Sequence, residues 1–275
     1  MPPDIKTMQL YPRAKRILAD LEALGYASDA PLRLDVLTRF DQLHYHGTQA
    51  IDAAIAACGI GAGDHVLEIG SGWGGCARYV AHSADATVNA VELQADYDLI
   101  ARDLTTRTGL GDRVTHVNAD FLDLDLPSDK FDHAVSWLAL FHIPRRADYL
   151  GKIAKTLKPG GFLFAEDLYR IQEPPPDEAE DFRRHLFPNS LVEIEAYRAS
   201  LDAAGLDIVG LEDMTADWTE FTAARLIAFR DARADYEAVH GTEGYSVIET
   251  FYSKMAGYFT RGLVGGVRYS ARRRA

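Results

Sequence analysis

The sequence predicts an α/β fold in which helices cover both faces of a mostly parallel sheet. From residue 65 onward, short apolar runs alternate with longer segments of helical periodicity. Parallel strands need a crossover connection, usually a helix, so this alternation is typical of a parallel sheet that is buried on both faces. The expected strands are 65–69, 87–91, 114–118, 133–137 and 162–165, and the expected helices between them are 76–82, 97–108 and 146–157.

Helical segments are expected before this regular region and after it. Apolar residues at helical spacing predict an N-terminal helix within 5–25 that ends at Gly25. Pro159-Gly160-Gly161 predicts a turn just before the fifth strand. The remaining expected elements are a helix at 49–58, a cap excursion at about 170–205 that includes a helix at 191–204, a strand at 206–211, a helical segment at about 216–261 and a final strand at 265–270.

Two regions follow from this reading, an N-terminal helical segment and lid at 1–60 and a core at 61–275. The segment 39–47 between the first two helices is rich in aromatic and imidazole groups, which is unusual for a linker. We therefore expect it to form the lid over a site on the core.

The amino-acid composition limits the kinds of molecule that the chain is expected to bind. The chain has 275 residues, of which 47% are hydrophobic and 25% are charged, as in an ordered globular protein. Its formal net charge of -12 opposes binding to nucleic acid or to an anionic membrane. A small-molecule substrate is the expected partner, and the sequence leaves open whether the chain forms a homo-oligomer.

Sequence features also predict a soluble, cytoplasmic protein. The first residues lack the basic region and apolar run of a secretory signal, and no apolar run reaches the roughly 18 residues that a membrane span needs. Cys58 and Cys76 are the only cysteines and form no CxxC pair. We interpret both as packing thiols in a reducing compartment.

A glycine-rich turn follows the first expected strand. The glycines Gly70, Gly72 and Gly74 let the backbone adopt conformations closed to other residues and let a ligand approach the main chain. Such a turn also closes many βα units that bind nothing. The second expected strand ends at Glu92, 24 residues after Glu68, where Rossmann-type sites place the carboxylate that accepts the ribose hydroxyls.

Asp120-Phe121 after the third strand helps to distinguish a dinucleotide site from other adenine-nucleotide sites. A carboxylate there can accept from an adenine amino group while the next ring packs on the base, an arrangement that dinucleotide enzymes do not need. A nicotinamide oxidoreductase is therefore disfavoured. A non-catalytic cofactor-binding protein remains an alternative.

Taken in order, the motifs 68–74, Glu92, 118–121, 131–137 and 157–161 resemble those of class I S-adenosylmethionine-dependent methyltransferases. The resemblance implies a Rossmann-like, seven-stranded sheet whose last strand is antiparallel. It implies S-adenosyl-L-methionine as the cofactor, with the glycine loop at its methionine part. The expected cofactor-binding residues are Glu68, Gly70, Ser71, Gly72, Trp73, Gly74, Glu92, Leu93, Asp120, Phe121 and Trp137.

Substrate groups are expected at the carboxyl ends of the strands or in the added segments. His142 is a candidate general base, because the reference pKa of imidazole lies near neutrality. Tyr45 is a second catalytic candidate, in the lid. The candidates for binding the substrate are His46, Asp167, Tyr169 and Arg225. No metal site is expected, because His44 and His46 lack a third ligand nearby.

Two resemblances compete for the substrate. The segment 40–47 ahead of the core resembles sarcosine and dimethylglycine N-methyltransferases, which implies methylation of nitrogen or oxygen in a small polar molecule such as an amine or amino acid. The motif 69–75 also resembles cyclopropane fatty-acid synthases, which attack an alkene. Carbon or oxygen methylation of a lipid-like or natural-product substrate is therefore the alternative.

Overall fold

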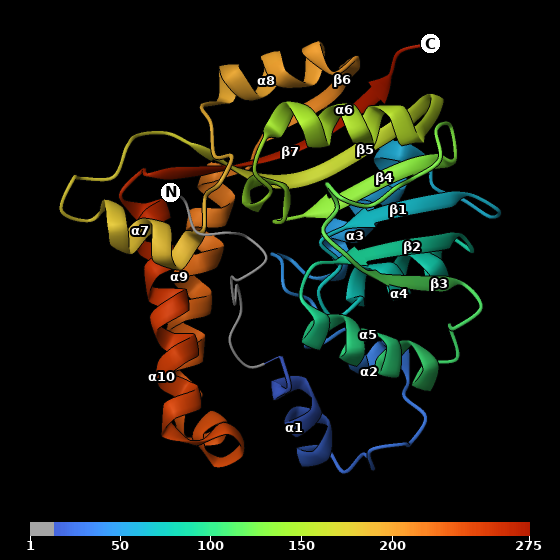
Figure 1. Ribbon diagram of the computed structural model, residues 1–275. Coiled ribbons are helices and arrows are strands. Elements are labelled where there is room, and N and C mark those ends of the chain that lie inside the picture. The colour runs from blue at the N-terminus through green and yellow to red at the C-terminus, as the bar shows by residue number, and fades with distance from the viewer. Residues whose placement is uncertain (1–13) are drawn as a thin grey trace.

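The computed structural model describes residues 14–275, so residues 5–13 of the expected first helix lie outside the described part. Seven strands form one sheet in the order β3-β2-β1-β4-β5-β7-β6, and β7 is antiparallel to both of its neighbours (Figure 1). This confirms the predicted Rossmann-like, mostly parallel sheet with an antiparallel last strand. The strands are β1 His65–Ile69, β2 Thr87–Glu92, β3 Val114–Asn118, β4 Phe131–Trp137, β5 Leu157–Arg170, β6 Leu206–Asp213 and β7 Val264–Arg273.

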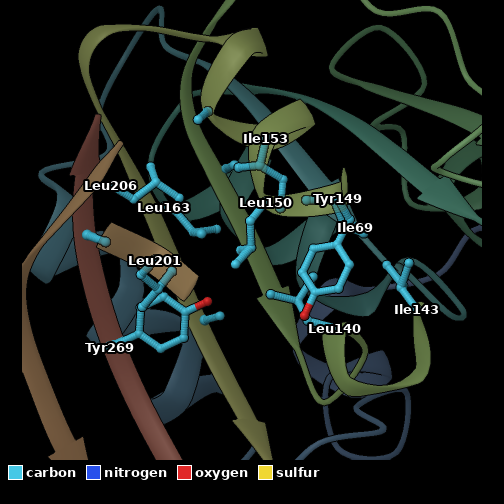
Figure 2. Packing of buried hydrophobic residues seen from close by; sticks show 14 of the residues in the cluster. Ile69, Leu140, Ile143, Tyr149, Leu150, Ile153, Leu163, Leu201, Leu206 and Tyr269 are labelled. Atoms are coloured by element: carbon cyan, nitrogen blue, oxygen red, sulfur yellow. The ribbon is translucent and has the colours of Figure 1, made fainter. Parts of the chain in front are cut away.

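Helices cover both faces of this sheet. Side chains alternate between the faces along each strand, so Val66 of β1 packs with α3 and α4, whereas Leu67 and Ile69 pack with α6 and α8. Figure 2 shows the second of these clusters, in which Leu150 and Ile153 meet Leu163 and Leu201. The helices are α1 Arg16–Ala23, α2 Leu34–Leu37, α3 Thr48–Cys58, α4 Gly75–Ser83, α5 Ala95–Arg107, the 3-10 turn Leu140–His142, α6 Arg146–Thr156, α7 Ala179–Leu186, α8 Ile194–Ala203, α9 Thr215–Asp231 and α10 Arg233–Thr260.

The fifth strand differs from its prediction in two ways. It begins at Leu157, and Pro159-Gly160-Gly161 forms a bulge within it, because β4 pairs Phe131 with Leu157 and then His133 with Phe162. It also continues to Arg170, since β7 pairs with it along the whole stretch from Phe162 to Arg170. The predicted turn and the predicted early end of this strand are therefore both wrong.

The segment expected to be helical at 216–261 consists of α9 and α10, which stand side by side next to the sheet, and α10 is kinked at Gly241 (Figure 1). Trp218 of α9 packs directly on Gly266 of β7, where an added Cβ would lie 2.1 Å from the indole ring. Gly266 pairs with Leu168 near the carboxyl end of β5, so α9 covers that end of the sheet. No helix within residues 14–275 is long and apolar enough to cross a membrane.

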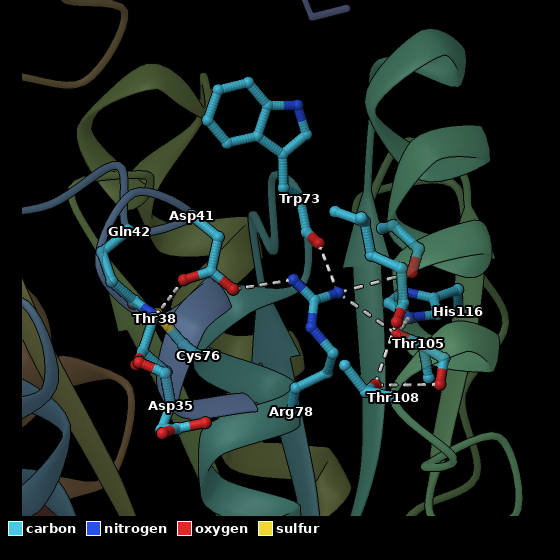
Figure 3. A network of polar contacts seen from close by, with 12 residues as sticks. Asp35, Thr38, Asp41, Gln42, Trp73, Cys76, Arg78, Thr105, Thr108 and His116 are labelled. Atoms are coloured by element: carbon cyan, nitrogen blue, oxygen red, sulfur yellow. Dashed lines mark hydrogen bonds and ion pairs between the residues drawn. The ribbon is translucent and has the colours of Figure 1, made fainter. Parts of the chain in front are cut away.

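A buried ion pair fixes the N-terminal segment to the core. The side chains of Asp41 and Arg78 are fully buried, and Arg78 Nη2 lies 2.9 Å from Asp41 Oδ2. Arg78 also donates to the carbonyl of Trp73 and to Thr105 Oγ1, so the network spans the lid segment, the glycine loop and α5 (Figure 3). Pairing and these extra acceptors offset part of the desolvation, although burial still raises the pKa of Asp41.

Gly151 offers a simple gain in stability. It lies exposed inside α6, and an added Cβ would meet no atom within 4 Å. Gly151→Ala is expected to raise the free energy of unfolding by about 0.5–1 kcal/mol, because alanine loses less conformational entropy in a helix than glycine. Urea denaturation of the two proteins measures this difference, and an unchanged or lower midpoint would contradict it.

Candidate active site

A cavity of about 100 Å³ lies where the strand order reverses between β1 and β4. Open α/β sheets bind ligands at this position, outside the carboxyl ends of the strands. Of the expected cofactor residues, those that line this switch-point cavity are Gly70, Gly72, Glu92, Leu93, Asp120, Phe121 and Trp137.

Glu92 organises the rim of the switch-point cavity. Its carboxylate accepts the N–H of Gly72 at 2.7 Å and the N–H of Gln94 at 2.8 Å. These bonds join the end of β2 to the glycine loop, and each carboxylate oxygen retains capacity for another donor. Burial raises the pKa of Glu92, and the two backbone donors oppose that rise. The side chain is thus positioned before a ligand arrives.

Asp120 and Phe121 line the cavity next to Glu92, beyond the end of the neighbouring strand β3. Asp120 Oδ1 accepts the N–H of Leu122 at 2.9 Å, which orients the carboxyl group in a tight turn after β3. Phe121 is buried at the cavity, and Lys152 Nζ lies 5.2 Å from its ring centroid. A carboxylate beside a buried ring is the arrangement expected for an adenine.

The glycine loop approaches the β4 loop so closely that a larger residue would not fit. Gly70 has a φ of +77°, and a Cβ placed on it would lie 2.2 Å from the Cβ of Ala139. The N–H groups of Gly70 and Ser71 both donate to the carbonyl of Val91, at 2.9 and 3.0 Å. The loop is therefore held by β2 on one side and packed on Ala139 on the other.

The other expected cofactor residues do not line the cavity. Trp73 is buried against Tyr97, at 5.3 Å between ring centroids, and its Nε1 donates to the carbonyl of Ala14, so it anchors the N-terminal segment. Gly74 is the N-cap residue of α4 and lies next to His116, where a Cβ would lie 2.6 Å from the imidazole. Ser71 and Glu68 are buried away from the lining as well. The compact glycine loop presents only some of its residues to a ligand.

Burial raises the pKa of the Glu68 carboxyl to about 8, with Arg78 opposing the rise and Glu92 adding to it. The native state therefore retains a proton that the unfolded chain releases near its ordinary pKa of 4.5. Stability should fall as pH rises through this window. Glu68→Gln keeps the shape of the neutral acid and removes the titration.

Glu68→Gln is expected to stabilise the protein by a few kcal/mol at about pH 8.5 and much less at about pH 5. Urea unfolding at both pH values measures this, with Glu195→Gln on the exposed face of α8 as the control. An equal effect at both pH values would contradict the assignment of the proton to Glu68.

His142 also lines the switch-point cavity. Its Nδ1 lies 3.1 Å from the carbonyl of Phe187, which can only accept, so Nδ1 carries the hydrogen. Nε2 is then a bare acceptor, and it is buried with no partner within residues 14–275. Burial lowers the pKa of His142 to about 4, so the ring is neutral at neutral pH.

A larger cavity of about 490 Å³ lies between the lid segment, α7 and α10. It shares Leu43 and Tyr97 with the switch-point cavity. A small cavity of about 20 Å³ lies next to both, since it shares His142 and Leu138 with the switch-point cavity and Arg225 and Phe187 with the larger one. The three cavities therefore adjoin one another around Leu43.

The structure brings Tyr45 to the small cavity beside His142 and places Arg225 at the small and the large cavity. Burial raises the pKa of the Tyr45 phenol, while the Arg225 guanidinium opposes the rise. Tyr45 therefore stays protonated at neutral pH and can act as a hydrogen-bond donor.

Three expected substrate residues are not at any of these cavities. Asp167 is fully buried and accepts from the Tyr197 hydroxyl at 2.7 Å and from the N–H of Phe141 at 3.2 Å. The Tyr169 hydroxyl bonds with Thr215 at 3.1 Å. His46 pairs with Asp217 of α9 at 2.6 Å. The prolonged β5 accounts for the positions of Asp167 and Tyr169, because it places both residues inside the sheet.

Sequence reasoning missed Leu43, Tyr97 and Ala139 as lining residues. Ala139 lies just beyond the end of β4, so the rule that ligands bind beyond strand ends could have found it. Leu43 belongs to the expected lid segment, in which Tyr45 and His46 were the predicted site residues. Nothing local marks Tyr97, which reaches the cavity from the first turn of α5.

A family model described as mycolic acid cyclopropane synthetase matches residues 39–267. The methyltransferase GfsG of Streptomyces halstedii is 29% identical over 192 residues, which cover 69% of this chain and 69% of GfsG. The sarcosine/dimethylglycine N-methyltransferase of Halorhodospira halochloris is 26% identical over 156 residues, covering 57% of this chain and 56% of that protein. Phosphoethanolamine N-methyltransferase 2 of Haemonchus contortus has the same fold, with a TM-score of 0.82 at 17% identity over 99% of this chain and 60% of that chain.

The seven-stranded sheet and the cavity at its switch point define a class I S-adenosylmethionine-dependent methyltransferase. The family match covers most of the chain and agrees with this class. The chain belongs to the mycolic acid cyclopropane synthetase family. The predicted cofactor and enzyme class are thereby confirmed, as is the likeness to small-molecule methyltransferases.

Proposed function

We propose that the chain transfers a methyl group from S-adenosylmethionine to an oxygen or nitrogen of a mainly apolar acceptor held in the large cavity. The cavity volume of about 490 Å³ lies in the range typical of small-molecule sites. Most of its exposed lining surface is apolar, and Leu43, Phe187, Val247, Ile248 and Phe251 are among the residues that line it. This lining supports the apolar alternative of the sequence interpretation over a small polar amine.

The residues at the switch-point cavity fit S-adenosylmethionine. Trp137 lines the cavity, and its buried Nε1–H has no acceptor within the described residues. Glu92 and Asp120 supply carboxylates, and Gly70 and Gly72 supply backbone that no side chain obstructs. When bound, the cofactor supplies a methyl group on a positively charged sulfur, so the protein needs mainly to position a nucleophile and exclude water.

The single observation that carries the proposal is the free Nε2 lone pair of the neutral His142 ring. Its unpartnered Nε2 lone pair belongs to a residue that lines both the switch-point cavity and the small cavity beside the large one. It can accept a hydrogen bond from an O–H or N–H of the acceptor and take the proton as the nucleophile reacts. The bond from Nδ1 to Phe187 keeps the ring in the tautomer that this role requires.

The first experiment measures the release of S-adenosylhomocysteine in the presence of apolar alcohols, phenols, amines and alkenes. An O–H or N–H compound should be turned over. His142→Asn retains an N–H that can donate to Phe187 and has no acceptor at the place of Nε2. It is expected to lower kcat by about 10²–10⁴-fold with a much smaller effect on cofactor affinity.

His82→Asn changes an exposed histidine of α4 and serves as the control. Unchanged turnover in His142→Asn would make the histidine structural. Turnover of alkenes alone would replace the proposal by carbon methylation.

We also propose a cytoplasmic location. Its support is that Cys58 and Cys76 are both buried and unpaired, as in proteins of reducing compartments.

A further inference from the structure

Arg225 of α9 lies where the large and small cavities adjoin. Its guanidinium carbon is 5.0 Å from the ring centroid of Tyr45, 5.4 Å from that of Phe221 and 4.3 Å from that of Tyr252. Aromatic rings attract a cation through their faces, but they do not provide the in-plane acceptors that guanidinium N–H groups need. Nε of Arg225 is buried and has no hydrogen-bond partner within residues 14–275.

Nearby arginines pair with carboxylates, whereas Arg225 has the phenol of Tyr45 as its hydrogen-bonding neighbour. Arg230, one and a half turns further along α9, donates to Glu249 at 2.8 Å, and Arg184 of α7 donates to Glu180 at 2.9 Å. No carboxylate of the described chain forms an ion pair with Arg225. A buried donor without an acceptor is costly, so this arrangement favours a ligand that supplies the missing acceptor.

The charge of the large cavity contrasts with that of the whole chain. Its lining carries the guanidinium groups of Arg16, Arg184 and Arg225 and the carboxylate of Glu243. Cations therefore outnumber anions there, although the chain has a formal net charge of -12. A concave site of this sign attracts anions and repels ammonium groups.

We propose that the methyl acceptor is an amphiphile whose oxyanion, a carboxylate or a phosphate, binds the edge of the Arg225 guanidinium while its apolar body fills the large cavity. The Tyr45 hydroxyl, which lines the small cavity with Arg225, supplies a second donor to the same group. Guanidinium groups suit this task because their planar fork binds carboxylate and phosphate oxygens bidentately. This inference rests on the proposed function only in placing the acceptor in the large cavity.

The experiment measures binding, without turnover, to protein saturated with S-adenosylhomocysteine. The probes are decanoate, decyl phosphate, decan-1-ol and decyltrimethylammonium, titrated by calorimetry below their micellar concentrations. Decanoate or decyl phosphate should bind at least tenfold more tightly than decan-1-ol, and the comparison of the two anions shows which oxyanion the site prefers. Decyltrimethylammonium should bind most weakly.

Arg225→Met should weaken binding of the preferred anion by about 10–100-fold and leave binding of decan-1-ol nearly unchanged, while Arg225→Lys should lie between. Arg230→Met on the same helix is the matched control and should retain the preference. Equal affinity of the native protein for anion and alcohol, tighter binding of the ammonium probe, or an intact preference in Arg225→Met would overturn the inference. The selectivity of the native protein decides the matter even if Arg225→Met does not fold.

Measurements of binding and of turnover test this inference and the proposed function independently of each other. Anion selectivity without release of S-adenosylhomocysteine from any acceptor would retain the oxyanion site and remove the proposed reaction. Turnover of uncharged acceptors without anion selectivity would do the reverse.

Discussion

Glu92→Ala is expected to weaken S-adenosylmethionine binding by about 100-fold. The carboxylate accepts the N–H groups of Gly72 and Gln94, and hydrogen bonds to a charged group contribute about 1.5–3 kcal/mol each. Alanine removes these two bonds together with any bond to the ligand. It removes the side-chain link between the end of β2 and Gly72 and leaves two backbone donors without their acceptor. Calorimetric titration with S-adenosylmethionine measures the loss.

Two further variants test whether the loss of affinity is specific to the switch-point cavity. Asp120→Ala removes the second carboxylate of the switch-point cavity and should also weaken binding. Glu195→Ala removes an exposed carboxylate of α8 and should leave the affinity unchanged. Wild-type affinity in both Glu92→Ala and Asp120→Ala would show that the cofactor binds elsewhere.

Gly70→Ala is expected to impair both cofactor binding and stability. The φ of +77° strains any residue with a Cβ, and the new Cβ would overlap that of Ala139 at 2.2 Å. Alanine has no rotamer that relieves this overlap, so the β1 and β4 loops must move apart. Overpacking and backbone strain together should cost on the order of 3 kcal/mol, equivalent to a fall in Tm of about 6–12 °C.

Gly151→Ala in α6 is the matched control, because it makes the same chemical change at a site with open space around it. Thermal unfolding should show opposite shifts for the two variants. Titration with S-adenosylmethionine should show lost affinity in Gly70→Ala alone. If Gly70→Ala matched the native protein in both measurements, the close approach of the two loops would be disproved.

Local patterns predicted the parallel part of the fold well. A buried strand such as β1 is a short apolar run with a definite end, and α3 ends at Gly59 in the left-handed conformation that glycine favours. The order of strands and helices then limits the topology, because parallel strands need crossover helices. Long-range pairing is harder to foresee. The extension of β5 to Arg170 depends on β7, roughly a hundred residues further along the chain.

The local sequence pattern also did not predict which way several side chains point relative to the cavities. Trp73 belongs to the glycine motif, yet it turns toward Tyr97 and the N-terminal segment. Arg225 was identified only by its chemistry, and its importance depends on three aromatic rings contributed by the lid, α9 and α10.

The sequence alone established the enzyme class and most of the cofactor wall, because the groups at the strand ends, among them Gly70, Glu92 and Asp120, are placed by strands that the local pattern reveals. The acceptor side depended on tertiary packing. Its walls come from the lid, α7, α9 and α10, segments far apart in the chain whose meeting no local periodicity encodes. Packing of these segments on the sheet changed the expectation from a small polar amine to a mainly apolar acceptor.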